Sequence, residues 1–398
     1  MTQPPSIVHD LQTSHGSVYG QEERDAVLAC IDENAPTCST RVASFESEFA
    51  GYCNTRYAVA VTSATAGLML AAVAIDIQPG DEVITTPVSW IATANAFKMR
   101  GAKIRFCDVD PRTLNLDPEA LKGLINPRTK AIVPVHLYGQ CCDMDAIAAI
   151  ADEAGVPIVE DCAHSPGASF NGRMAGSFGA AGVFSFHQQK NIVTLGEGGM
   201  LTTDEDRIYA RAMSFRSHCY RVYGSRYTFG GIDENEQPME KRYWWQEFDD
   251  IGYNFRLTDA QAAVGSVQLT KLDTHNARRA ELAHRLTESI ADVSTVVPPF
   301  VDPRAKHVYH LFPLLLQENH PLGKNEFMWR MLHDHGIKAL SHYIPIHTTA
   351  VYRRMGHRPE ECPTACRIFE RLVTLPIHPR LTDQAIDYMA DAIRQLSR

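Results

Sequence analysis

The sequence VEDCAHSPGASFNGRMAGSFGAAGVFSFHQQKNIVTLGEGGM, residues 159–200, contains two short apolar runs, each followed by a chemically reactive side chain. The first run begins at Ile158 and ends in Asp161, which predicts a buried strand with a carboxylate at its C-terminal edge. The second, 182–186, predicts another buried strand and leads to Lys190. A lysine amine beside a buried strand can be desolvated, which lowers its pKa and prepares it to form a Schiff base.

An acid and a lysine in this order suit pyridoxal phosphate. That cofactor needs a lysine for its carbonyl carbon and an anion that keeps its ring nitrogen protonated. Spacing alone leaves a plainer alternative open, in which Lys190 lies on the surface after a strand and Asp161 caps a loop.

Outside this stretch, strand patterns alternate with helix patterns. Continuous apolar runs predict strands at 57–61, 81–86, 103–109 and 131–140, and apolar periodicity predicts helices at 21–33, 41–52, 68–73 and 144–154. This alternation predicts an α/β fold with a mostly parallel sheet that is covered on both faces. Ligands of such sheets bind beyond the C-terminal ends of the strands. The residues that follow the predicted strands there are Ser63, Trp90, Asp161 and Lys190.

Two features of this edge have alternative interpretations. Residues 62–67, TSATAG, join a predicted strand to a predicted helix, so their amides and the helix dipole could bind an anion. A plain N-cap is the other interpretation. Trp90 could be a core aromatic or a site residue.

Several ordered motifs identify a family resemblance. They are E-D-x-A-H at 160–164, F-S-F at 184–186, Lys190, G-E-G-G at 196–199, P-V-H-x-Y-G at 134–139 and G-Y-N-x-R at 252–256. Together they resemble the DegT/DnrJ/EryC1/StrS family of sugar aminotransferases over nearly the whole chain. The resemblance implies the fold-type I architecture: a large domain with a mostly parallel, seven-stranded type of sheet between helices, and a smaller C-terminal α/β domain.

The resemblance also implies residue roles. Lys190 is the expected catalytic residue, which holds the cofactor and transfers a proton. The residues expected to bind pyridoxal 5'-phosphate are Ser63, Ala64, Thr65, Trp90, Asp161, His164, Ser185 and Asn254. Asn254 is expected to reach the site of a partner subunit, which implies a homodimer with shared active sites. His342 and its neighbour Tyr343 are expected to contact the substrate.

The implied reaction moves an amino group from glutamate or glutamine to a ketone, with pyridoxamine 5'-phosphate as the aminated cofactor. The expected ketone is a keto sugar, most often nucleotide-linked, in aminosugar, antibiotic or polysaccharide biosynthesis. A cyclitol ketone of an aminoglycoside pathway is an alternative. Dehydratases of the family carry His in place of the lysine, and a regulatory relative should have lost Lys190 or Asp161. The presence of both residues disfavours these two readings.

Composition narrows the class of protein further. The net charge is -9 without a dominant basic cluster, which argues against nucleic-acid and anionic-membrane partners. No apolar run approaches a membrane span, and the N-terminus lacks the pattern of a secretory signal, so we expect a cytoplasmic protein. The ten scattered cysteines are expected to be reduced thiols. The pairs His333/His335 and His342/His347 lack a third ligand, so no metal is expected.

The expected domain organisation has three parts. Residues 1–20 form an N-terminal arm, 21–270 the large cofactor-binding domain and 271–398 the smaller domain. The polar, aromatic-rich segment 217–250 is expected to be an irregular insertion. It either shapes the pocket or a subunit interface, or is a packed surface segment. In the smaller domain, 307–312 is expected to be a strand.

Overall fold

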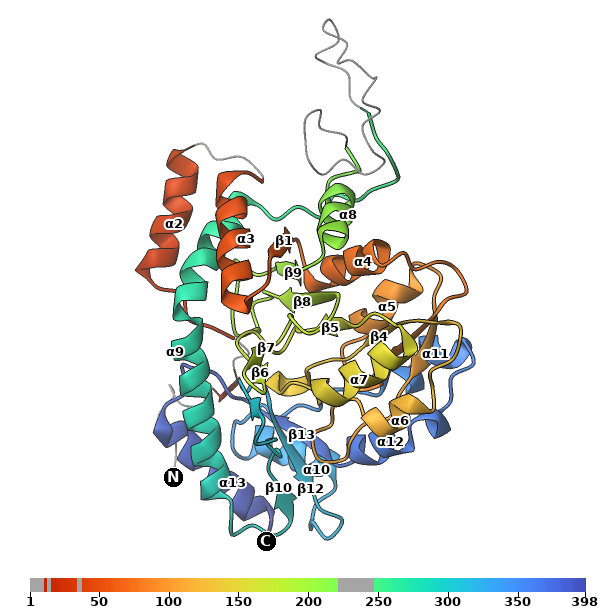
Figure 1. The fold of residues 1–398 in the computed structure, drawn as a ribbon. Helices are drawn as coiled ribbons and strands as arrows, with labels where there is room; N and C mark the ends of the chain where they lie inside the picture. Colours follow the sequence, from red (N-terminus) through yellow and green to blue (C-terminus); the bar gives the residue numbers. More distant parts are fainter. Residues whose placement is uncertain (1–10, 13–15, 34–37, 221–246) are drawn as a thin grey trace, which may run out of the picture.

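The computed structural model describes residues 11–12, 16–33, 38–220 and 247–398 (Figure 1). Most of the predicted arm 1–20 and the centre of the predicted insertion 217–250 lie outside the described residues. Within the described part of the chain, no helix is both long enough and apolar enough to cross a membrane. The ten cysteines are free thiols in the structure.

Strands from residues 57–203 form a large mixed sheet. Its spatial order is β1 (Tyr57–Val61), β9 (Gly199–Thr203), β8 (Ala181–Ser185), β5 (Val159–Asp161), β4 (Thr129–Val133), β2 (Glu82–Thr85) and β3 (Lys103–Phe106). A four-stranded and a three-stranded part meet at β5 and β4, through the parallel bridges Ile132–Ile158 and Val135–Asp161. Only β9 runs antiparallel to its neighbours. The prediction of a mostly parallel α/β sheet is therefore confirmed.

Alternating strand residues face two separate hydrophobic cores, because successive side chains of a strand point to opposite faces. In β1, Val59 and Val61 belong to one core, whereas Ala58 and Ala60 belong to the other. The helices that contribute to the first core include α4 (Ala64–Ala74), α5 (Ala92–Lys98) and α8 (Asp206–Arg216). Those of the second include α3 (Thr40–Cys53), α6 (Pro118–Lys122) and α7 (Met144–Ala154). Burial on both faces explains why these strands are continuous apolar runs.

A smaller antiparallel sheet lies toward the C-terminus. Its order is β10 (Val296–Val297), β12 (Phe312–Leu316) and β13 (Leu372–Leu375), and α10 (Lys324–His333) and α13 (Asp383–Leu396) share its core. The long helix α9 (Asp259–Ser289) runs past both sheets and packs against α2 (Gln21–Asp32), α3 and α13 (Figure 1). The expected boundary at 271 lies inside α9, and the division into domains stays a prediction.

The remaining elements are short. They are η1 (Leu137–Gly139), β6 (Ser169–Phe170), β7 (Arg173–Met174), β11 (Ala305–Lys306), η2 (Ile346–Thr348), α11 (Ala350–Arg354), η3 (Pro359–Glu361) and α12 (Pro363–Phe369).

The prediction of a strand over 307–312 is wrong. Residues 307–311 connect β11 to β12 and belong to neither strand. Their backbone bonds to η1 instead: Val308 N–H donates to the carbonyl of Gly139 at 2.9 Å, and His310 N–H donates to that of Tyr138 at 2.8 Å. This connection brings His310 to the C-terminal edge of the large sheet, close to Lys190.

Candidate active site

A cleft that is open to solvent lies at the C-terminal edge of the large sheet. Segments that follow β1, β2, β5 and β8 line it, together with residues 342 and 343 from the C-terminal part of the chain. The predicted site residues that line this cleft are Ser63, Ala64, Thr65, Trp90, Asp161, His164, Ser185, Lys190, His342 and Tyr343. The fold thus brings together, in one chain, every predicted site residue except Asn254.

Lys190 follows β8 and lies where two cavities meet. It lines the large cleft and also a smaller cavity that is lined by the segments around His310 and Pro376. Burial lowers the pKa of Lys190 to about 8, although the negative charge of Asp161 acts in the opposite direction. A substantial fraction of the amine is therefore neutral near pH 8, as a nucleophile or general base requires.

Asp161 ends β5 and is almost completely buried. The Thr93 hydroxyl donates to its Oδ2 at 2.7 Å, and the backbone N–H of Ala163 donates to its Oδ1 at 3.0 Å. Burial nevertheless raises the pKa of Asp161, although these two hydrogen bonds and the charge of Lys190 oppose the rise. No described basic side chain lies within ion-pair distance of this carboxylate. A cationic ring N–H in the cleft would compensate the buried charge.

Helix α4 also begins at the cleft. Ser63 is its N-cap, and the serine Oγ accepts from Ala66 N–H at 3.2 Å. The N-cap and anion-site interpretations are therefore compatible, because the cap and the first turn line the cleft. A Cβ at Gly199 of β9 would lie 2.6 Å from the Ser63 carbonyl carbon. A glycine at this position is what allows β9 to approach the start of α4 so closely.

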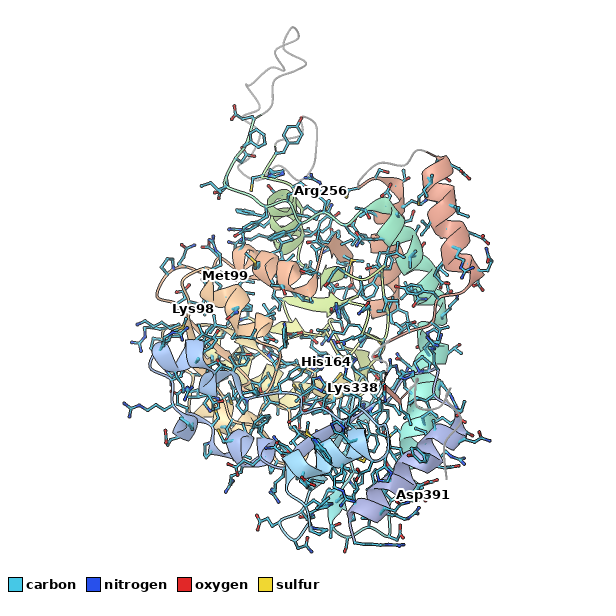
Figure 2. All side chains as sticks on the ribbon, turned by 180° about the vertical axis from the view of Figure 1, so that it is seen from behind. Lys98, Met99, His164, Arg256, Lys338 and Asp391 are labelled. Carbon is cyan, nitrogen blue, oxygen red and sulfur yellow. The ribbon has the colours of Figure 1, made fainter. Side chains whose placement is uncertain are left out.

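His164 links the cleft to the C-terminal part of the chain and lies near the centre of the molecule (Figure 2). The backbone N–H of Tyr138 donates to its Nδ1 at 3.3 Å, so in the neutral ring Nε2 carries the proton. Nε2 lies 3.1 Å from the Tyr343 hydroxyl and donates to its oxygen. Burial, followed by the charges of Lys190 and His342, lowers the pKa of His164 well below its ordinary value, so the ring is neutral.

His342 and Tyr343 are held beside this ring. Nδ1 of His342 lies 2.6 Å from the Thr374 hydroxyl, and burial lowers the pKa of His342 to about 4. The Tyr138 hydroxyl donates to the His342 carbonyl. Because His164 donates to the Tyr343 oxygen, the hydroxyl hydrogen of Tyr343 remains available to a ligand in the cleft.

Among the predicted site residues, Trp90 is exposed to solvent and Ser185 is buried. Trp90 is 65% exposed, and its ring lies edge-on to that of Tyr343, with 6.2 Å between the centroids. The alternative of a core aromatic is therefore excluded for Trp90. Ser185 ends β8 and is 7% exposed, and its Oγ accepts from His187 N–H at 3.4 Å.

Asn254 does not line the cleft of its own chain. It is exposed, and its backbone bridges to that of Ser217. Its expected role in a partner subunit stays a prediction.

Three residues of the site escaped the sequence analysis: Thr93, Tyr138 and His310. Thr93 follows Trp90 by three positions, so a helical turn after Trp90 would have pointed to it. Tyr138 lies in the P-V-H-x-Y-G motif, but nothing in the sequence indicates which group its hydroxyl contacts. His310 was not predicted as a site residue because residues 307–312 were predicted to be a strand.

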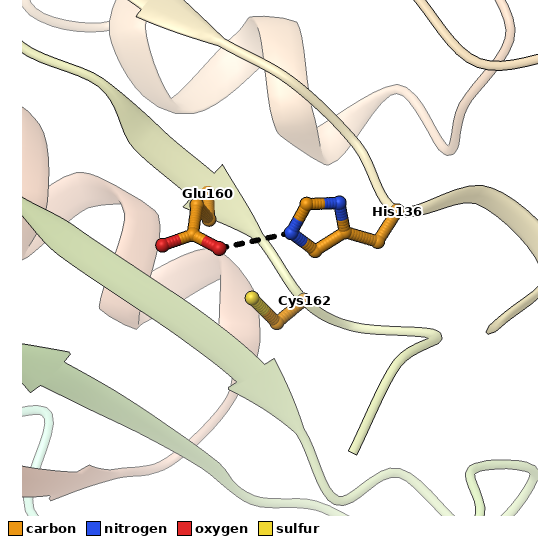
Figure 3. A group of neighbouring side chains, drawn as sticks. All are labelled: His136, Glu160 and Cys162. Carbon is orange, nitrogen blue, oxygen red and sulfur yellow. Dashed lines mark hydrogen bonds and ion pairs between the residues drawn. The ribbon is translucent and has the colours of Figure 1, made fainter. Parts of the chain in front are cut away.

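One buried group in the described part of the chain has the composition of a metal site: His136, Glu160 and Cys162 (Figure 3). The Glu160 carboxylate already accepts from His136 Nε2 at 2.9 Å and from three backbone N–H groups, those of residues 176, 178 and 179. His136 Nδ1 accepts from Cys142 N–H at 3.1 Å. Burial raises the pKa of the Cys162 thiol well above its ordinary value, which disfavours the thiolate that a metal needs. We interpret the cluster as the structural anchor of the turn that precedes β8.

These residues fit pyridoxal phosphate. Asp161 offers a buried anion without a described ion-pair partner, Lys190 offers an amine with a lowered pKa, and the start of α4 offers backbone donors for a phosphate. All three face one cleft.

Comparison with known proteins agrees with this geometry. Residues 18–394 match the model of the DegT/DnrJ/EryC1/StrS aminotransferase family. The chain is 36% identical over 382 residues to the spore coat polysaccharide biosynthesis protein SpsC of Bacillus subtilis, with 95% of each chain covered. It is 36% identical over 376 residues to the GDP-perosamine synthase of Caulobacter vibrioides, covering 94% of this chain and 95% of that one.

A solved structure shows the same architecture. The crystal structure of S. venezuelae DesV in complex with a ketimine intermediate superimposes with a TM-score of 0.84 at 32% sequence identity, covering 95% of both chains. The chain therefore belongs to the DegT/DnrJ/EryC1/StrS aminotransferase family, and it is a transaminase with the fold-type I architecture.

Proposed function

We propose that this transaminase uses pyridoxal phosphate to move an amino group from glutamate or glutamine to a nucleotide-linked keto sugar. The observation that supports the cofactor assignment is the single cleft that Lys190, Asp161 and the start of α4 all line. The names of a GDP-perosamine synthase and of a polysaccharide biosynthesis protein among the relatives support a sugar substrate. The intact Lys190 and Asp161 disfavour both a dehydratase and a regulatory role.

When bound, the cofactor supplies an electrophilic carbon and an electron-withdrawing ring that acidifies the donor Cα–H. Lys190 would take up this proton in the half-reaction with the amino donor and would return a proton to the substrate carbon in the half-reaction with the ketone. Its lowered pKa permits both roles. Asp161 would keep the ring nitrogen protonated. The amides of Ala64 and Thr65 and the hydroxyls of Ser63 and Ser185 would hold the phosphate.

Two further groups would orient the substrate. Tyr343 has a hydroxyl hydrogen available toward the cleft, because His164 already donates to its oxygen. Trp90 presents an exposed aromatic face at the same cleft. We also propose a homodimer in which Asn254 completes the partner's phosphate site, in keeping with its exposed position outside its own cleft.

The test is an absorbance spectrum of the purified protein with pyridoxal phosphate, recorded for the wild type and for Lys190→Ala. We expect a visible band that requires Lys190, that bleaches with glutamate or glutamine, and that recovers with a nucleotide-linked keto sugar. Recovery with a cyclitol ketone alone would overturn the sugar assignment. A wild type that shows no lysine-dependent band despite an intact fold would overturn the cofactor assignment.

A further inference from the structure

We propose that His310 is a positioning residue that accepts a hydrogen bond from the amine of Lys190 and sets where that amine lies when it is free. His310 Nε2 lies 3.4 Å from Lys190 Nζ, although the two residues are 120 positions apart. Contacts within catalytic sites are often this long before ligands bind. The inference rests on the proposed role of Lys190.

The side-chain amides of Asn276 and Asn191 determine which group donates and which accepts in the contact between Lys190 and His310. The side-chain amide of Asn276 donates to the Pro166 carbonyl at 2.9 Å, so its Oδ1 faces the other way and accepts from Asn191 Nδ2 at 2.8 Å. Asn191 Nδ2 also donates to the Val308 carbonyl at 3.0 Å. Both donor hydrogens of Asn191 are therefore used, and its Oδ1 can act only as an acceptor.

That acceptor selects the tautomer of His310. Asn191 Oδ1 lies 3.3 Å from His310 Nδ1, so Nδ1 carries the proton. The lone pair of the neutral ring is consequently on Nε2, which faces Lys190. The ring also packs on His164, with 4.2 Å between the centroids, which limits its rotation.

His310 is neutral because its surroundings disfavour a second cation. Burial lowers its pKa well below the ordinary value, and neighbouring basic groups lower it further. The titratable groups that face His310 and Lys190 come from several segments: Asp161 from β5, His164 from the turn after β5, Arg279 from α9, and His342. A neutral acceptor next to Lys190 can therefore stabilise its ammonium form without adding charge.

The consequence is a measurable property of Lys190 in the protein without cofactor. A hydrogen-bond acceptor favours the protonated amine, so its loss should lower the pKa of Lys190 further below its present value of about 8. His310→Leu removes the acceptor, and we expect a fall of about one pKa unit. His310→Gln retains a side-chain oxygen, and we expect it to restore most of the difference.

The experiment measures the pH dependence of acylation of Lys190 by an amine-reactive reagent, with peptide mass spectrometry as the readout, on the cofactor-free full chain. His307→Leu is the matched control. His307 is also a buried histidine in the same segment, and its Nδ1 accepts from Tyr309 N–H at 2.9 Å. It lines a different cavity from Lys190. Thermal melting of each variant confirms that it is folded.

Support for the proposal is a lower midpoint in His310→Leu, with His310→Gln and His307→Leu close to the wild type. If His310→Leu titrates like the wild type, or if His307→Leu shifts the midpoint equally, His310 only fills space and the proposal is wrong. Should His310→Leu not fold, the comparison is made between His310→Gln and His310→Asn. The shorter Asn side chain should leave Lys190 without its acceptor, so His310→Asn should have the lower midpoint. Because the readout needs no cofactor, it separates this proposal from failure of the proposed function, which would appear as a missing lysine-dependent absorbance band.

Discussion

At the scale of single residues, the proposed chemistry needs two buried groups in different states: a neutral amine on Lys190 and an ionised carboxylate on Asp161. Burial lowers the pKa of Lys190, which makes its amine available, and raises that of Asp161, which opposes its ionisation. Thr93 and the amide of Ala163 counteract the second effect by donating to the carboxylate. The role that we propose for Asp161 at the ring nitrogen would thus depend on a hydroxyl 68 positions away in the sequence.

We predict that Thr93→Val raises the pKa of Asp161, because it removes a hydrogen bond to the ionised form. Activity should then be lost at a higher pH as the solution is acidified, with the acidic limb of kcat/KM moved up by about one unit. Asp161→Asn should lower kcat by about 100-fold or more at every pH. An unchanged acidic limb in Thr93→Val would show that Asp161 does not determine it.

At the scale of elements, the N-termini of α4 and α13 have similar caps but different positions relative to the cleft. Ser63 caps α4 at the cleft, whereas Thr382 caps α13 in the C-terminal part with an equivalent bond, accepting from Ala385 N–H at 3.2 Å. The two caps provide the same local stabilisation, so they form a matched pair.

We predict that Ser63→Ala and Thr382→Ala each cost about 1 kcal/mol of unfolding free energy in urea titrations. Only Ser63→Ala should also weaken binding of pyridoxal phosphate, because only that cap lines the cleft. Equal cofactor affinity in the two variants would contradict the proposed phosphate site.

At the scale of the whole molecule, the single chain leaves one predicted group outside its cleft. Asn254 is exposed, as are its neighbour Ile251, at 89%, and Trp90 at the cleft. In the homodimer that we propose, a second copy of the chain would cover such surfaces and Asn254 would reach the partner's site.

A subunit-mixing experiment tests this arrangement. Lys190→Ala and Asn254→Ala homodimers should each have little activity. Denatured together in equal amounts and refolded, they should regain roughly a quarter of the wild-type activity, because half of the dimers are mixed and each mixed dimer has one intact site. Mixing that restores nothing, when each parent refolds normally alone, would place Asn254 in the site of its own subunit. An active Asn254→Ala homodimer would place Asn254 outside the reaction.

The sequence by itself determined the parallel strands, the helices between them and the positions of Lys190 and Asp161 after two of those strands. These features are local: burial on both faces makes strands continuously apolar, and motif residues lie at fixed distances from a strand end. Only the tertiary structure decided that Thr93 bonds Asp161 and that His310 faces Lys190. Those contacts join segments that are far apart in sequence. Each contact requires the backbone to place two side chains within hydrogen-bond distance of each other. A pattern of apolar and polar residues does not specify positions that precisely.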